Sequence, residues 1–98
     1  MATSIDDKQS FHITVLFFAS AREAAGGVSK VDLEIMDNCN NTSNLRTVLA
    51  ERYPKLAAMV LDEDSLTLAL NEEYVVSGQV IELKAGDTVA LIPPISGG

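Results

Sequence analysis

Few side chains in this sequence could do chemistry, and none of them stands in a catalytic or metal-binding pattern. Cys39 is the only cysteine, and its neighbours in the sequence NCN offer no second ligand for a metal ion. A single cysteine also excludes a disulfide within the chain. His12 is the only histidine and stands among apolar residues, which favours an exposed histidine on a strand. We therefore predict no metal site, and the end of the chain is the remaining candidate for chemistry.

The sequence ends with PPISGG, residues 93–98, directly after the apolar run TVALI. Pro93 and Pro94 have no backbone N–H group to donate to a neighbouring strand, so strand pairing should end at Ile92. The fixed φ angle of proline also favours an extended chain beyond that point. We expect residues 93–98 to form an extended, flexible tail.

The last four residues of this tail are suited to entering a narrow pocket of another protein. Beyond Pro94 they can reach about 13 Å when extended. Ile95 and Ser96 would span the gap between the two proteins. Gly97 and Gly98 have no side chains, so they would fit a channel that is too narrow for other residues.

The α-carboxyl group of Gly98 is the predicted reactive group of the chain. It is ionised at neutral pH and can attack the α-phosphorus of ATP. The resulting acyl adenylate is an electrophile for sulfide or a persulfide, and glycine minimises crowding at the carbonyl under attack. No acidic or basic side chain lies near this end of the sequence, so catalytic residues would have to come from partner proteins.

Composition favours one small globular domain. The chain has 98 residues, of which 47% are hydrophobic, and a formal net charge of −7. This charge argues against nucleic acid and anionic membranes as partners. The first ten residues, MATSIDDKQS, lack a basic start and an apolar core, and no apolar run is long enough to span a membrane. We predict a cytosolic protein with a mobile leader (1–10), a domain (11–92) and a tail (93–98).

Hydrophobic patterns predict strands and helices in a definite order. A strand is expected at 11–18, a helix of about two turns after it, and a strictly alternating strand at 30–36 that pairs back on the first. A helix at 44–53, capped by Thr42 or Ser43, should end before Pro54, and KLAAMVL could add a further turn. A β-hairpin is expected in which SLTLAL (65–70) and YVV (74–76) are the strands and NEE (71–73) is the turn. KAGD (84–87) should form a second tight turn, and TVALI (88–92) is the last strand.

This order predicts an α+β fold, in which a mixed sheet of four to five strands packs on one main helix. A sheet that half-wraps one helix is the β-grasp arrangement of ubiquitin. By alternation, Ile13, Val15 and Phe17 should face the helix, while the side chains expected on the other face form an apolar patch for partner proteins. That patch consists of Leu16, Phe18, Tyr74 and Ile92.

Four stretches taken together resemble the small subunit of molybdopterin synthase, the MoaD-like sulfur carrier family. They are LFFASARE (16–23), LRTVLAERYP (45–54), LALNEEYV (68–75) and AGDTVALIPPISGG (85–98). The resemblance covers nearly all of residues 11–98, in the same order and with similar spacing, and leaves out residues 1–9.

The resemblance implies a carrier without catalytic side chains of its own. A partner related to ubiquitin-activating enzymes would use ATP to adenylate Gly98, which then becomes a thiocarboxylate, and no cofactor would stay bound. The large synthase subunit, as part of a heterotetramer, would transfer the sulfur to cyclic pyranopterin monophosphate. The patch and the tail residues Pro93, Pro94, Ile95 and Ser96 would then contact the partners.

Two other functions remain compatible with the tail. One is a sulfur carrier for another pathway, such as thiazole synthesis or tRNA thiolation. The other is a ubiquitin-like modifier whose Gly98 carboxyl group is joined to a lysine of a target protein. A binding module with an inert tail is a third reading.

Overall fold

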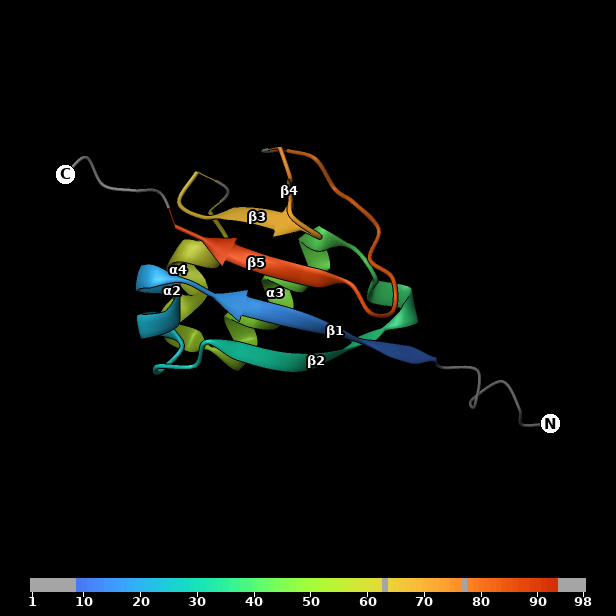
Figure 1. The fold of residues 1–98 in the computed structure, drawn as a ribbon, viewed down its shortest axis with the longest axis horizontal. Helices are drawn as coiled ribbons and strands as arrows, with labels where there is room; N and C mark the ends of the chain where they lie inside the picture. Colours follow the sequence, from blue (N-terminus) through green and yellow to red (C-terminus); the bar gives the residue numbers. More distant parts are fainter. Residues whose placement is uncertain (1–8, 63, 77, 94–98) are drawn as a thin grey trace.

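The computed structural model describes residues 9–62, 64–76 and 78–93, which form one sheet with helices on one of its faces (Figure 1). The strand order is β2-β1-β5-β3-β4. The strands are β1 (Ser10–Phe17), β2 (Lys30–Met36), β3 (Thr67–Leu70), β4 (Glu73–Tyr74) and β5 (Thr88–Ile92). The two central strands, β1 and β5, run parallel, and the other neighbours pair antiparallel. This mixed sheet of five strands confirms the predicted fold class.

The helices form the second layer. The longest is α3 (Thr42–Arg52), and it lies behind the sheet together with α4 (Ala57–Val60), while α2 (Ala19–Ala24) follows β1 at one end (Figure 1). Two short 3-10 helices, η1 (Asp37–Cys39) and η2 (Pro54–Leu56), connect these elements. In the part of the chain that the structure describes, no helix has the length and apolar character needed to cross a membrane.

The core fills the space between the sheet and α3, and period-two alternation explains which strand residues enter it. Ile13, Val15 and Phe17 of β1 are buried, as predicted. The buried residues of β2, β3 and β5 that join them in the core are Leu33, Ile35, Leu68, Val89 and Leu91. Leu45 and Leu49 project from α3 into the same core. The ring of Phe17 meets that of Tyr53 edge-on, with 5.3 Å between the ring centroids.

Helix α3 begins earlier than the sequence indicated, and its predicted cap is wrong. Asn41 is the N-cap, because its side-chain Oδ1 accepts a hydrogen bond of 2.9 Å from the backbone N–H of Asn44. The hydroxyl of Thr42 is buried and instead accepts a hydrogen bond of 3.0 Å from the N–H of Ile81. Thr42 therefore ties the helix to a distant loop, a role that local capping preferences do not show.

Small differences also occur at the first strand. Strand β1 starts at Ser10, within the predicted leader, because Ser10 pairs with Met36 of β2 and its hydroxyl donates to the carboxylate of Glu34. Residues 1–8 of the leader and 94–98 of the tail lie outside the described residues. The turn predicted at 84–87 is present, with Gly86 at a φ of +85°.

Candidate functional site

The face of the sheet opposite the helices, here called the outer face, carries the apolar side chains that alternation predicted there. Leu16 is half-buried and Phe18, directly after β1, is 48% exposed. Ala90 and Ile92 of β5 lie on the same face, since their neighbours Val89 and Leu91 point into the core. The register pairs Leu16 with Ala90, which places the two strands' outer residues side by side.

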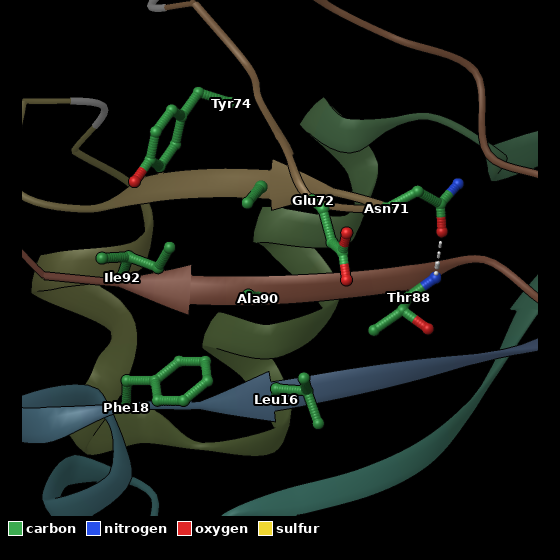
Figure 2. A pocket seen from close by; sticks show the side chains of 9 residues that line it. Leu16, Phe18, Asn71, Glu72, Tyr74, Thr88, Ala90 and Ile92 are labelled. Atoms are coloured by element: carbon green, nitrogen blue, oxygen red, sulfur yellow. Dashed lines mark hydrogen bonds between the residues drawn. The ribbon is translucent and has the colours of Figure 1, made fainter.

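These residues line a hollow of about 580 Å³ on the outer face, here called the outer hollow (Figure 2). Strands β1, β3 and β5 supply its floor, and the turn between β3 and β4 supplies one border. The four side chains of the predicted patch, from β1, β4 and β5, all line it. The full lining consists of Leu16, Phe18, Ala69, Asn71, Glu72, Tyr74, Thr88, Ala90 and Ile92.

Tyr74 occupies the border of the outer hollow on the edge strand. It pairs with Ala69 of β3 and is 71% exposed, so most of its ring faces solvent (Figure 2). Together with Phe18 and Ile92, which line the same hollow, this exposed ring makes the surface largely apolar. Such surfaces commonly mark contacts with other proteins.

A tight turn in the same hairpin forms another part of the border. Strands β3 and β4 are joined by two residues, Asn71 and Glu72, with φ values of 51° and 75°. The side chain of Asn71 accepts a hydrogen bond of 2.9 Å from the N–H of Thr88 and donates one of 3.0 Å to Asp87. Its backbone N–H donates to the carbonyl of Thr88 at 2.8 Å. The turn is thus fastened to the start of β5.

Sequence reasoning missed Asn71, Glu72 and Thr88 as members of this surface. The stretch NEE predicts a hairpin turn, and Asn71 and Glu72 do form one, whereas Glu73 belongs to β4. That Asn71 and Glu72 lie beside the start of β5 depends on the antiparallel pairing of β3 with β5, for which the sequence carries no local signal.

The chain leaves the sheet at the end of the outer hollow where Phe18 and Ile92 lie. Strand β5 ends at Ile92, where the two prolines were expected to stop pairing. Pro93 is buried and lines a separate hollow with Ser20, Met59 and Ser65, on the side of α2 and α4. It therefore anchors the base of the tail inside the molecule and does not extend the outer hollow. Pro94 to Gly98 lie outside the described residues.

The remaining polar groups of the described residues form no reactive cluster. His12 Nδ1 lies 3.3 Å from Asp32 Oδ2, with both side chains largely exposed, as predicted for a histidine on the open face of a strand. Within residues 9–62, 64–76 and 78–93, no three His, Cys, Asp or Glu side chains are placed to hold a metal ion. Among the described residues, the apolar side chains of the outer hollow therefore remain the candidate site.

Comparison with known proteins assigns the chain to a family. Residues 15–98 match the ThiS family. The molybdopterin synthase sulfur carrier subunit of Chlamydomonas reinhardtii is 40% identical over 86 residues, which cover 88% of this chain and 98% of that protein.

Solved structures share the fold. The HVO 2177 protein of Haloferax volcanii superimposes with a TM-score of 0.78 at 25% identity, covering 95% of this chain and 92% of that one. SAMP1, a small archaeal modifier protein, from the same organism gives a TM-score of 0.72 at 27% identity, covering 92% and 100%. The chain therefore belongs to the ThiS family and has the molybdopterin synthase sulfur carrier subunits among its relatives.

Proposed function

We propose that this protein is the sulfur carrier subunit of a molybdopterin synthase. One observation carries the proposal: the similarity to a molybdopterin synthase sulfur carrier subunit runs through 88% of the chain at 40% identity. The sequence PPISGG supplies the group that such a carrier needs, a terminal glycine carboxylate on a stretch of chain that follows the last strand.

The proposed chemistry takes place at the carboxyl carbon of Gly98. A carboxylate oxygen attacks the α-phosphorus of ATP, and pyrophosphate leaves, which gives an acyl adenylate. Sulfide then attacks the carbonyl carbon, AMP leaves, and a thiocarboxylate remains. If the donor is a persulfide, the first product is an acyl disulfide, and a thiol must reduce its S–S bond to release the thiocarboxylate. An activating enzyme would catalyse both steps, because the sequence has no acidic or basic side chain between Asp87 and Gly98.

The thiocarboxylate would be used on the large subunit of the synthase, where its sulfur passes to cyclic pyranopterin monophosphate. In this proposal the outer hollow is the docking surface, since it is the exposed apolar face next to the end of β5. Ile95 and Ser96 would cross from this surface to the large subunit's active site. Gly97 would let Gly98 pass through a narrow channel.

Mass spectrometry of the intact chain tests the chemistry. The protein would be incubated with the activating enzyme, ATP and a sulfur donor, and we expect one terminal oxygen to be replaced by sulfur. A chain that lacks Gly98 is the matched control and should remain unchanged. An unaltered carboxylate, under conditions that convert a known carrier, would contradict the proposal. Adding the large subunit and the pyranopterin should then return the carboxylate.

A protein modifier is the second candidate, because SAMP1 shares the fold over 92% of this chain. That function predicts covalent adducts in which the Gly98 carboxyl group is joined to lysine side chains. Such isopeptide bonds survive denaturants and thiol reductants, whereas a thiocarboxylate contact does not hold two proteins together under these conditions. Denaturing gels of the chain isolated from its own cells distinguish the two functions.

A further inference from the structure

Glu72 is the one charged residue among the described residues that line the outer hollow. Figure 2 shows its carboxylate extending from the turn between β3 and β4 toward β5, on the side where Ala90 forms the floor. Most of the surrounding lining is apolar, including Leu16, Phe18 and Ile92. A single carboxylate therefore stands at the border of a surface that otherwise suits an apolar contact.

This carboxylate has no partner within the described part of the chain. No hydrogen bond or ion pair joins the side chain of Glu72 to residues 9–62, 64–76 or 78–93. Its acidic neighbour Asp87 is different, because it accepts hydrogen bonds from the side chain of Asn71 at 3.0 Å and from the N–H of Lys84 at 2.8 Å. Of the two acids in this corner, only Glu72 is left to interact outward.

The backbone holds Glu72 in place. Two-residue hairpin turns with positive φ at both positions favour glycine at the second one, where this chain has Glu72 at a φ of +75°. The preceding Asn71 is fastened to Asp87 and Thr88 by three hydrogen bonds. The base of the Glu72 side chain is therefore fixed relative to the floor of the outer hollow, although its carboxylate is exposed.

A protein that covers the outer hollow would take water away from this carboxylate. Desolvating an ionised carboxylate is strongly unfavourable unless an opposite charge replaces the water. We propose that the partner surface seated on the outer hollow places a guanidinium or ammonium group against Glu72, so that this residue selects a partner with an apolar contact flanked by a cation. The inference rests on the proposed function in one respect, because the partner is taken to be the large subunit.

Charge-matched variants at two adjacent positions test this inference. Glu72→Lys and Glu73→Lys change the net charge equally. Glu73 is exposed on β4 and lies outside the lining of the outer hollow. The affinity of each for the large subunit from the same organism would be measured by calorimetric titration at low and high salt. Glu72→Gln, which removes the charge and keeps the shape, is the third variant.

We expect Glu72→Lys to weaken binding at least about tenfold at low salt, because like charges would then be forced together. Glu72→Gln should weaken binding less and reduce the salt dependence of the affinity. Glu73→Lys should change the affinity by no more than about threefold, since only screened, long-range electrostatics would be altered.

Two outcomes overturn the inference, and they differ in what else they exclude. If the wild-type chain binds the large subunit while Glu72→Lys and Glu73→Lys weaken binding equally or not at all, Glu72 meets no cation, and the proposed function stands. If the wild-type chain does not bind the large subunit, the proposed function fails and the inference fails with it.

Discussion

At the scale of single residues, Glu72 combines an unfavourable backbone conformation with a place on the border of the outer hollow. A residue with a Cβ atom at positive φ costs about 1 kcal/mol relative to glycine. We therefore predict that Glu72→Gly raises the free energy of unfolding by about 1 kcal/mol, measured by urea denaturation. The wild-type protein would thus be less stable than its Glu72→Gly variant.

The matched control for this stability measurement is Glu73→Gly. Glu73 lies in strand β4, where glycine loses conformational entropy and gains no relief of strain, so unfolding should become easier by about 0.5–1 kcal/mol. Opposite signs for two neighbouring glutamates would show that the turn conformation of Glu72 is what costs stability. Destabilisation by Glu72→Gly would contradict the strained turn.

At the scale of secondary-structure elements, one side chain fastens helix α3 to the end of α4 and to the segment that follows it. The guanidinium of Arg46 donates to the carbonyl oxygen of Val60 at 2.7 Å and to that of Leu66 at 3.2 Å. Both of these residues are fully buried. The connection fixes the chain between the helical layer and the sheet.

Replacing Arg46 by methionine keeps the aliphatic stem and removes both donors. We predict that the free energy of unfolding falls by about 1–3 kcal/mol, because two partly buried carbonyl groups lose a charged donor. Arg52→Met, on the same helix and with an exposed side chain near Tyr53, is the control and should cost at most about 1 kcal/mol. Equal losses for the two variants in thermal and urea unfolding would refute a special role for Arg46.

Elements with a strict pattern could be predicted from the sequence to the residue. The alternating strand at 30–36 and the last strand at 88–92 have the predicted bounds, because burial on one face imposes a period of two on the side chains. The start of α3 could not be predicted in the same way. The hydroxyl of Thr42 has a partner far away in the sequence, Ile81, and that contact leaves capping to Asn41.

The candidate site, too, could be predicted from the sequence only in part. Leu16, Phe18 and Ile92 could be grouped in advance, since alternation places their side chains on one face of the sheet, whereas no such pattern fixes the place of Tyr74. Glu72 could not be added, because its place at the border of the outer hollow follows from the pairing of β3 with β5 and from the left-handed turn. Hydrophobic periodicity predicts neither which distant strands pair nor which residues adopt a positive φ.

At the scale of the whole molecule, the two faces of the sheet have different roles. The helices bury one face, whereas the described residues leave the outer face uncovered, with Phe18 and Tyr74 among the exposed large apolar side chains (Figure 1). Because β1 and β5 pair in parallel, both strands finish at the same end of the sheet. Phe18 and Ile92 therefore lie near the point where the chain continues to the tail. A partner seated on this face would be well placed to receive the tail.

This arrangement predicts that Phe18→Asp separates binding from folding. Phe18 is 48% exposed, so the change should alter the free energy of unfolding by no more than about 1 kcal/mol. Affinity for the large subunit should fall at least about tenfold, because the change puts a carboxylate in the apolar part of the docking surface. Val80→Asp adds the same charge at a residue that is 57% exposed and outside the lining of the outer hollow, and it should bind normally. A folded Phe18→Asp protein that binds with wild-type affinity would show that the tail alone, and not this face of the sheet, recognises the partner.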